Sequence, residues 1–407
     1  MNKIKTMPVW QRNMYILWIG VFLTGIGLSM VTPFLSLYIN TLGHYSKSML
    51  SLYSSLAFSG SYLTMAIASP FWGRLADTKG RKKMIVRAGL AMGVAFFLMG
   101  LVTNVWQLIL LRAIQGALGG FTSNANALIA SETPIERSGY SMGIMMTGST
   151  AGTLLGPLIG GVLADTVGYR FSFTLTGGLI LAATVLVIFW VKEEFSPKAK
   201  EEQQTLSRKE VFAMLPYPRV MWGFFITTMM IMAVNQSINP ILALFVQELT
   251  HNANNTAFLA GLVAATPGVA SLIFAPQLGR LGDKYGTSKV MLSGFILGVI
   301  VFLPMGWVSA VWQLAALRFF VGITDSTMMP SIQTLITKTT PHEVVSRMFA
   351  YNQSFQSLGS VAGPIIGAVA TGLFDYQGVF IISALIIGIN GLWFHHNTKV
   401  LRQDGIA

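Results

Sequence analysis

The chain has 407 residues, of which 53% are hydrophobic and only 10% are charged, with no cysteine and a formal net charge of +12. A soluble domain carries about 25% charged residues, so this composition excludes an ordinary soluble protein and indicates a membrane protein. The absence of cysteine excludes disulfides, thiol nucleophiles and cysteine-ligated metals. No histidine has a partner at metal-ligand spacing, and we expect neither a metal nor a cofactor.

Uncharged stretches long enough to cross about 30 Å of hydrocarbon as helix recur along the whole chain. Continuous helix is the expected form, because the strands of an outer-membrane barrel would alternate in polarity every second residue. We therefore predict an all-α membrane protein with twelve transmembrane helices. In chain order, the expected spans are 14–38, 51–73, 84–103, 106–130, 138–164, 170–191, 220–247, 256–279, 289–308, 311–337, 346–372 and 377–396.

The sequence repeats itself after about half its length. Residues 73–83 read GRLADTKGRKK, and residues 279–289, which follow 206 positions later, read GRLGDKYGTSK. Arg112 returns as Arg318 at the same offset. In a membrane protein, such duplication is typical of a transporter that rocks two similar halves about a central site. We therefore expect two pseudo-symmetric bundles of six helices each.

The longest polar stretch lies between the sixth and seventh spans. Residues 192–219 mix acids with bases and contain three prolines, a composition typical of a solvated linker. We expect the two bundles to occupy 1–191 and 220–407, on either side of this linker. The linker is either a plain tether, which we favour, or a tether with a short amphipathic helix near 206–215.

The positive charges follow the topology of the membrane. All but four of the 27 Lys and Arg lie at the termini or in the loops on the same face as the termini. The exceptions are Arg112 and Arg318 inside spans, and Lys47 and Arg170 in loops of the opposite face. By the positive-inside rule, both termini are expected in the cytoplasm, as in a multi-pass protein of a bacterial cytoplasmic membrane. The same rule explains the net charge, so no nucleic acid is expected as a partner.

The repeated loop motif is a candidate conformational latch. Asp77 is the only acid among the bases of its first copy, and topology alone requires neither this acid nor the glycines. An acid so placed can form ion pairs, or lie near a helix N-terminus, in one conformation and lose those contacts in another. The residues expected to form the latch are Gly73, Asp77, Gly80, Arg81 and, in the second copy, Asp283.

Three stretches resemble signatures of the major facilitator superfamily and of the proton-driven drug exporters within it. Residues 73–83 are similar to the signature of loop 2–3, 108–120 (LILLRAIQGALGG) to the helix 4 motif with a buried Arg, and 148–161 (GSTAGTLLGPLIGG) to the glycine–proline motif of helix 5. The resemblance covers essentially the whole chain. It implies the major facilitator fold, no enzymatic activity, and alternating-access export of small amphipathic compounds in exchange for protons. It also implies a coupling role for Arg112.

The span 106–130 carries one polar stripe. Its members fall on one face of a continuous helix: Arg112, Gln115, Gly119, Thr122 and Asn126. A buried cation costs about 2.5–3.5 kcal/mol in a membrane, so Arg112 should face a wet cavity. The alternative is that Arg112 bonds to carbonyls at a helix end and only holds the bundle together.

Asp325 is the only acid near the middle of a span. It follows Arg318 by seven residues, hence on the same face and about 10 Å further along the helix. Carboxyl groups in desolvated sites exchange protons near physiological pH, as a carrier must. We predict that Asp325 carries the proton, with Arg112 and Arg318 assisting; a static Asp325–Arg318 ion pair is the alternative. Many related exporters have an acid in helix 1 or helix 4, and its absence here disfavours a strong preference for organic cations.

Small residues mark a close helix contact in each half. The four-residue spacing of Gly148, Gly152, Gly156 and Gly160 lets helix backbones approach, and Pro157 weakens the helix between them. Gly363 and Pro364 stand at the equivalent place in the second half. We expect these seams to be tightly packed and to allow rocking.

Polar residues inside spans are candidates for contact with substrate. They are Thr32, Gln115, Asn126, Asn235, Gln236, Asn239, Gln333, Asn352 and Gln356. The leading hypothesis is a multidrug exporter that works as a monomer, and the alternative is a specific exporter of a sugar or organic acid. A membrane-embedded enzyme is set aside, because the spans offer no cysteine or histidine and only one acid near mid-membrane.

Overall fold

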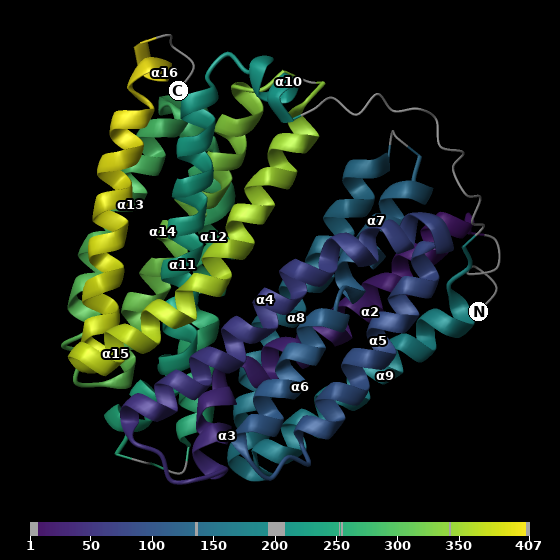
Figure 1. Cartoon of the computed structure of the whole chain (residues 1–407), viewed down its shortest axis with the longest axis vertical. Helices are drawn as coiled ribbons and strands as arrows, with labels where there is room; N and C mark the ends of the chain where they lie inside the picture. The colour runs from purple at the N-terminus through teal and green to yellow at the C-terminus, as the bar shows by residue number, and fades with distance from the viewer. Residues whose placement is uncertain are drawn as a thin grey trace. The chain divides into compact units, whose positions relative to one another are not determined.

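The computed structural model of the chain describes residues 7–134, 137–193, 208–251, 253, 255–341 and 343–403. Within the helices, the description leaves out the side chains of Asp77, Arg208, Lys209, Asp283 and Ser346. All regular structure in these ranges is helical, and they contain no strand (Figure 1). The predicted all-α class is confirmed.

The helices follow the expected spans in chain order. They are α2 (Val9–Val31), η1 (Thr32–Phe34), α3 (Leu35–Thr41), α4 (Lys47–Lys79), α5 (Arg81–Met99), α6 (Val105–Leu118), α7 (Phe121–Glu132), α8 (Ser138–Thr166), α9 (Tyr169–Trp190), α10 (Arg208–Ala213), α11 (Pro218–Leu249), α12 (Thr256–Tyr285), α13 (Thr287–Met305), α14 (Val311–Lys338), α15 (Val345–Asn397) and α16 (Lys399–Gln403). Among the described residues, seven helical segments are each long and apolar enough to cross a membrane. The other expected spans fall on α4, α5, the α6–α7 pair and α14, and α15 covers two of them.

The first predicted span differs from the structure, and one predicted gap coincides with a kink. The expected first span is interrupted, because α2 ends at Val31 and a single 3-10 turn with Pro33 precedes α3. Proline lacks an amide hydrogen and crowds the preceding turn, which accounts for this interruption. In α15, Phe374 and Asp375 leave the helical conformation, and Asp375 has φ 59°. The kink falls in the gap expected between the last two spans.

Contacts divide the chain into two units. Unit 1 comprises 1–44, 60–201 and 253–265, and unit 2 comprises 45–59, 202–252 and 266–407. Each unit thus holds most of one half of the sequence and a short segment from the other half. The two short segments are equivalent positions of the repeat. Of the expected linker, the structure describes the ends, including α10, and the stretch 194–207 lies outside the described residues.

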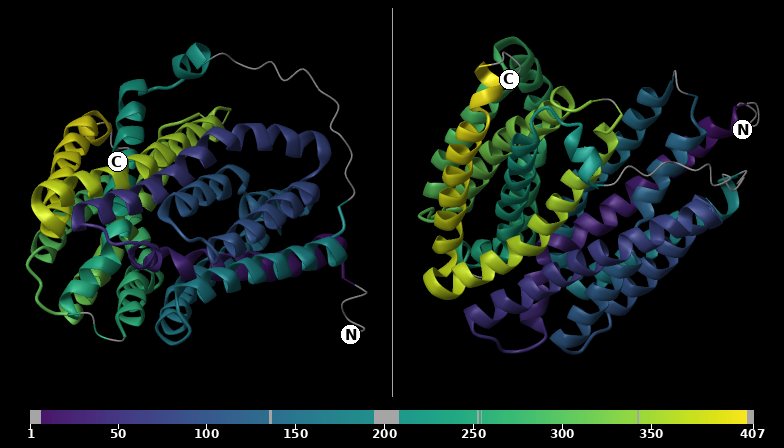
Figure 2. Two further views of the ribbon diagram at one scale, coloured as in Figure 1. Left: turned by 60° about the horizontal axis from the view of Figure 1, so that its bottom comes forward. Right: turned by 45° about the horizontal axis from the view of Figure 1, so that its top comes forward.

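The units use the same helix pairs. In unit 1, α2 packs along α8 and α9, and α5 packs along α9. In unit 2, α11 packs along α15, and α13 packs along both α14 and α15 (Figure 2). Aromatic rings fill both cores: Tyr38 lies 4.8 Å from Phe173, and Phe394 lies 5.8 Å from Phe295, between ring centroids. The sequence repeat therefore corresponds to a repeat of packing.

Close glycine contacts join α2 to α8. A Cβ atom added to Gly156 would lie 2.7 Å from the carbonyl oxygen of Ile26, and one added to Gly160 would lie 2.1 Å from that of Met30. In unit 2, a Cβ on Gly363 would lie 2.5 Å from the carbonyl oxygen of Ala233. The backbones thus touch where the glycine spacing predicts close packing. Whether these seams also rock remains a prediction.

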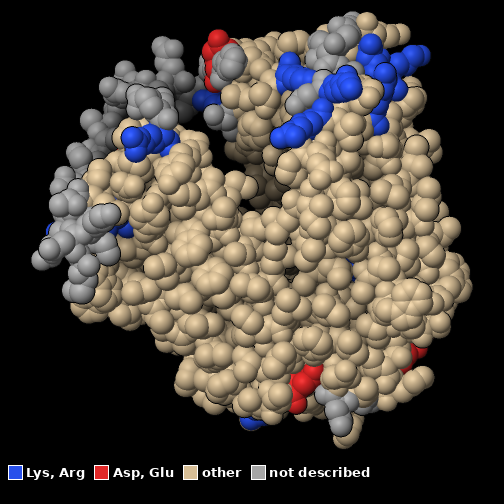
Figure 3. Space-filling view, turned by 180° about the vertical axis from the view of Figure 1, so that it is seen from behind, with Lys and Arg blue, Asp and Glu red and all other residues tan. Residues whose placement is uncertain are grey.

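The outer surface suits a lipid environment. Many large apolar side chains are exposed on the helix flanks, and in the face shown in Figure 3 Lys and Arg gather near helix ends. Trp106 and Trp312, which are equivalent in the repeat, are 61% and 71% exposed at the starts of α6 and α14. Exposed tryptophans at helix ends are typical of the boundary between membrane and water.

Candidate functional site

Arg112 is buried in unit 1, with 7% of its surface exposed. Its Nη1 donates to Oε1 of Gln115 at 3.2 Å, one turn along α6. Tyr62 of α4 lies close enough to interact electrostatically with the guanidinium. The sequence predicted that Arg112 and Gln115 share one face of a helix. It did not predict Tyr62, because the sequence alone does not show which residues of α4 lie beside α6.

The predicted continuous helix over 106–130 is wrong. It breaks into α6 and α7 at Gly119 and Gly120, where Gly120 has φ +114° and ψ 18°. A side chain disfavours this left-handed conformation, so adjacent glycines allow the break. The expected stripe is therefore not continuous: Arg112 and Gln115 lie on α6, and Thr122 and Asn126 lie on α7. The Gly-Gly dipeptide was the available signal.

Two side chains bind the backbone carbonyls at this break. Trp72 Nε1 donates to the Ala117 oxygen at 2.7 Å, and Arg87 Nη2 donates to the Gly119 oxygen at 3.1 Å. The Arg87 guanidinium also lies 3.5 Å from the centroid of the Trp72 ring. Trp72 directly precedes the loop motif and Arg87 follows it. The residues on either side of the motif thus bind the break between α6 and α7, a contact that the sequence did not predict.

Asp325 of α14 lies in a polar cluster of unit 2. Its Oδ1 accepts a hydrogen bond from Asn235 Nδ2 of α11 at 2.9 Å. Arg318 is 8% exposed and interacts electrostatically with Asp325, but the described residues contain no ion pair between them within 4.0 Å. The alternative of a static ion pair therefore does not describe this structure. Asp325 keeps some accessible surface although protein atoms surround it.

Asp325 also stands at an informative place in the repeat. At the offset of 206, it corresponds to Gly119, the first residue of the helix break in unit 1. The two equivalent helices therefore differ at the same position: one breaks, and the other remains continuous and carries the acid. The chemistry of the two halves is not symmetric, even though their packing is.

Some of the remaining candidate substrate residues are bonded to nearby groups, and others have polar atoms without a partner. Asn239 Nδ2 donates to Gln236 Oε1 within α11, and Thr32, at the start of η1, donates to the Leu28 oxygen of the preceding helix α2. Buried oxygens of Asn126 and Asn352 have no hydrogen-bond partner among the described residues. Of the others, Gln333 is exposed and Gln356 is half-buried. Groups without partners are the ones still able to bind a ligand.

The predicted latch stays a prediction, because the side chains of Asp77 and Asp283 are not described. Gly73 lies inside α4, and Gly80 precedes α5 with φ 93°. A different acid binds the start of α5. The Glu193 carboxylate accepts the backbone N–H groups of Arg81 and Lys82, at 2.8 and 2.9 Å.

We expect Glu193→Gln to lower the stability of the protein by about 0.5–2 kcal/mol, the usual loss when a helix N-terminus loses its cap. The amide has one acceptor oxygen in place of two and carries no charge to oppose the helix dipole. Thermal unfolding of the purified protein measures the change. Glu343→Gln, at an exposed acid, is the control, and equal melting temperatures for the two variants would contradict the assignment.

An ionic cluster lies at the helix ends of unit 2. Lys47 Nζ lies 2.8 Å from a Glu248 oxygen and 2.5 Å from an Asp375 oxygen. Burial alone would lower the pKa of Lys47, but its hydrogen bonds to Asp375 and Glu248 outweigh burial, and the pKa is raised. A raised lysine pKa contributes stability at every pH below 10.5, which is lost only as pH rises through the folded value. Lys47 is therefore charged throughout the physiological range.

Asp165 binds a helix N-terminus within unit 1. Its two carboxylate oxygens accept the backbone N–H groups of Ala257 and Phe258, at 3.0 and 2.7 Å, in the first turn of α12. A carboxylate here opposes the positive end of the helix dipole. Sequence analysis gave Asp165 no role, because its partner lies 92 residues away.

Comparison with known proteins identifies the family. The model of the Major Facilitator Superfamily matches residues 17–253 and 224–404. Proteins named "Multidrug resistance protein MdtG" are similar over nearly their whole length. That of Dickeya zeae is 45% identical over 389 residues, 95% of each chain, and that of Citrobacter koseri is 43% identical over 394 residues, 97% of each chain.

Solved structures with the same fold are more distant in sequence. A bacterial homolog of the human lysosomal transporter Spinster, in an inward-facing and occupied conformation, has a TM-score of 0.79 at 13% identity and covers 97% of this chain. The nucleoside transporter NupG has a TM-score of 0.76 at 16% identity, over 95% of this chain and 100% of its own. At these identities the likeness concerns the fold alone. The chain belongs to the Major Facilitator Superfamily, and it is a membrane-spanning transporter of small molecules rather than an enzyme.

Proposed function

We propose that this protein is a multidrug exporter of the bacterial inner membrane, with both termini in the cytoplasm, that exchanges small amphipathic compounds for protons. The observation that carries the proposal is the 43–45% identity to proteins named for multidrug resistance, over 94–97% of this chain. Relatives this similar and of similar length usually carry out the same type of transport. The positive-inside distribution of Lys and Arg supports the orientation.

Asp325 is the residue that we assign to the proton. The carboxyl group lies inside unit 2, is held by the Asn235 amide, and is not consumed by an ion pair with Arg318. An amide donor can bond to either form of the carboxyl, because the protonated acid still has an acceptor oxygen. Protonation therefore changes the charge of the site without dismantling it.

The cycle follows from this charge. Asp325 is protonated while the site is open to the outside. It releases its proton to the cytoplasm after the switch to the inward-open state, and substrate then binds. Arg318, nearby, assists the release by attracting the carboxylate. Each proton that enters with a membrane potential of 100 mV contributes about 2.3 kcal/mol to export.

The buried charges of each unit bear on the choice of substrate. Unit 1 contains the buried Arg112, and its position equivalent to Asp325 is Gly119, which carries no charge. A buried guanidinium repels organic cations and binds carboxylates or carbonyl oxygens. We therefore propose that neutral, zwitterionic and anionic compounds are exported at least as well as cations. The protein is proposed to act as a monomer.

Purified protein in liposomes with a pH-sensitive dye inside tests the proposal. With a proton gradient imposed, several unrelated neutral and anionic compounds are each expected to trigger proton movement. Protein-free liposomes with the same compounds are the control for leakage. A response to one chemical class alone would replace multidrug export with export of a specific metabolite. No proton movement with any compound would refute the proposed coupling.

A further inference from the structure

The equivalent helices α5 and α13 differ in what binds the N–H groups at their starts. In unit 1, α5 begins after Gly80, and its first two N–H groups, of Arg81 and Lys82, are bound by the carboxylate of Glu193. Backbone N–H groups at a helix start have no partner within the helix, so such a carboxylate satisfies them. A helix start next to such an acid needs no further anion.

In unit 2, no acid among the described side chains bonds to the same helix start. The equivalent helix α13 begins after Gly286, and the N–H groups of Lys289 and Val290 bond to the Gly286 oxygen. Among the described atoms, the N–H groups of Thr287 and Ser288 have no acceptor. The residue equivalent to Glu193, at the offset of 207 that relates the ends of α9 and α15, is Val400.

A described charge beside this helix start in unit 2 has the opposite sign. At the offset of 206, Glu132 of unit 1 is replaced by Lys338, the last residue of α14. Lys338 Nζ lies 3.3 Å from Thr287 Oγ1 and donates to it. A cation beside a helix N-terminus is repelled by the positive end of the helix dipole. An anion between the two would turn this repulsion into attraction on both sides.

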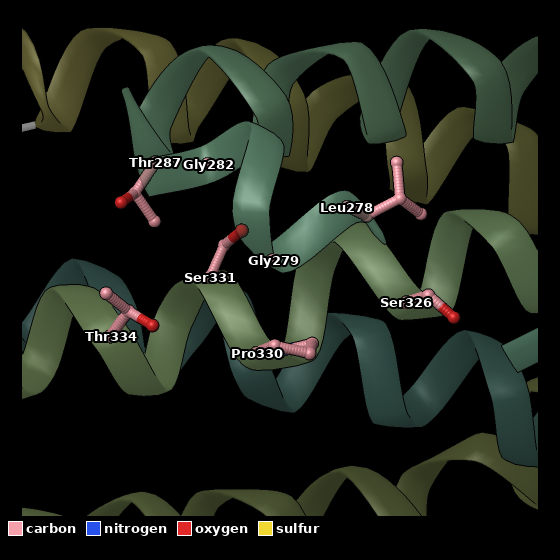
Figure 4. Close-up of a pocket in the computed structure, with 8 residues that line it drawn as sticks. All are labelled: Leu278, Gly279, Gly282, Thr287, Ser326, Pro330, Ser331 and Thr334. Atoms are coloured by element: carbon pink, nitrogen blue, oxygen red, sulfur yellow. The ribbon is translucent and has the colours of Figure 1, made fainter. Parts of the chain in front are cut away.

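A small pocket opens beside this helix start. It has a volume of about 30 Å³ and is lined by Gly279, Gly282, Thr287 and residues of α14 (Figure 4). Ser331 is only 7% exposed, its hydroxyl has no hydrogen-bond partner among the described residues, and it points toward the α12–α13 turn in Figure 4. Ser288, fully buried, also has an Oγ without a partner. Of these two residues Ser331 lines the pocket, and its hydroxyl is a donor without an acceptor among the described residues, as an anion site requires.

We propose that this helix start binds a phosphate group, which we name the α13 anion site. The donors are the N–H groups of Thr287 and Ser288, the hydroxyl of Ser331 and the ammonium of Lys338. Backbone N–H groups at a helix start combined with a lysine are a recurring arrangement for phosphate. The pocket has room for about two atoms the size of water, so it takes phosphate oxygens and leaves the rest of the ligand outside.

The phosphate can come from an anionic lipid headgroup or from free phosphate, and one experiment separates the two. The melting temperature of the purified full-length protein, in uncharged detergent at constant ionic strength, is measured with inorganic phosphate and with chloride. A second series adds phosphatidylglycerol or, as the control lipid, phosphatidylcholine. We expect phosphate or phosphatidylglycerol to raise the melting temperature by several degrees, and phosphatidylcholine to have no such effect. Which of the two acts identifies the source.

Variants connect the shift to the site. Lys338→Glu restores the residue of the first repeat, and Val400→Glu supplies a carboxylate at the position of Glu193; each is expected to weaken the apparent affinity at least tenfold. Lys284→Ala, at a lysine that lies over Tyr285 instead, is the matched control and should bind as wild type does. Because the two site variants act at different places, misfolding of one leaves the other as a test.

Two results would overturn the assignment. One is the absence of any shift with both phosphate sources, or an equal shift in the wild type and in both site variants. The other concerns Asp283, which precedes Thr287 by four residues in the sequence and whose side chain is not described. If the wild type gives no shift but Asp283→Asn does, the chain supplies its own anion and the proposed ligand does not exist.

Discussion

Asp325→Asn is expected to abolish uphill export, with a loss of at least tenfold in accumulation ratio, while the protein remains folded and still binds substrate. The amide cannot gain or lose a proton, yet it has nearly the size of the acid and keeps an oxygen that accepts from Asn235. The variant should therefore lose proton-driven export but keep exchange. Exchange of labelled for unlabelled substrate without a gradient needs no proton and should persist. Both are measured in the same liposomes.

Two control variants exclude a merely structural effect at this position. Asp325→Glu keeps a titratable group and should keep part of the coupling. Thr324→Val changes the neighbouring residue, whose hydroxyl bonds only within its own helix, to the Val321 oxygen, and should export normally. Proton-driven accumulation by Asp325→Asn at the wild-type level would show that another group carries the proton.

The second large effect is expected for Gly160→Ala. The added Cβ would lie 2.1 Å from the Met30 oxygen and 2.5 Å from its Cγ, so α2 and α8 would have to separate. Overpacking of this kind usually costs about 1–3 kcal/mol. Because α2 and α8 pack along their lengths, the cost here should reach the upper end of that range. A lower melting temperature of the purified protein measures it.

Gly143→Ala is the matched control on the same helix. Nothing lies within 4 Å of a Cβ built at Gly143, and alanine favours the helix by about 0.5–1 kcal/mol relative to glycine. This variant should therefore be neutral or slightly more stable. Opposite signs for the two substitutions would establish that helix contact, and not helix propensity, requires glycine at 160. Equal stability of both variants would show that the close approach of α2 and α8 does not require glycine at 160.

The sequence predicted those features that its own periodicity encodes. Apolar stretches of about 20 residues predicted the helices, and the offset of 206 predicted equivalent packing in two units, since equal side chains at equal spacing pack alike. The glycine run from Gly148 to Gly160 predicted that α8 packs closely against another helix, but not that this helix is α2. These features depend on local composition, which a single sequence contains in full.

The site was predicted only in part, because its contacts join distant residues. Asp325 was identified as an isolated intramembrane acid, but its partner Asn235 lies 90 residues away, and no pattern relates the two. Glu193 caps a helix that begins 112 residues earlier, and it looked like an ordinary charge in a linker. The break at Gly119 and Gly120 had a local signal, which the long apolar run around it concealed.

The exchange of short segments between the units has an evolutionary consequence. Residues 253–265 belong to unit 1 and supply the N–H groups that Asp165 binds, while 45–59 belong to unit 2 and supply Lys47 to Glu248 and Asp375. Neither half of the sequence is therefore a complete folding unit. If the chain arose by duplication, its six-helix ancestor would have exchanged the corresponding segment with a second copy of itself. The present transporter is then a fused dimer whose two subunits have since diverged, one gaining an acid where the other gained a break.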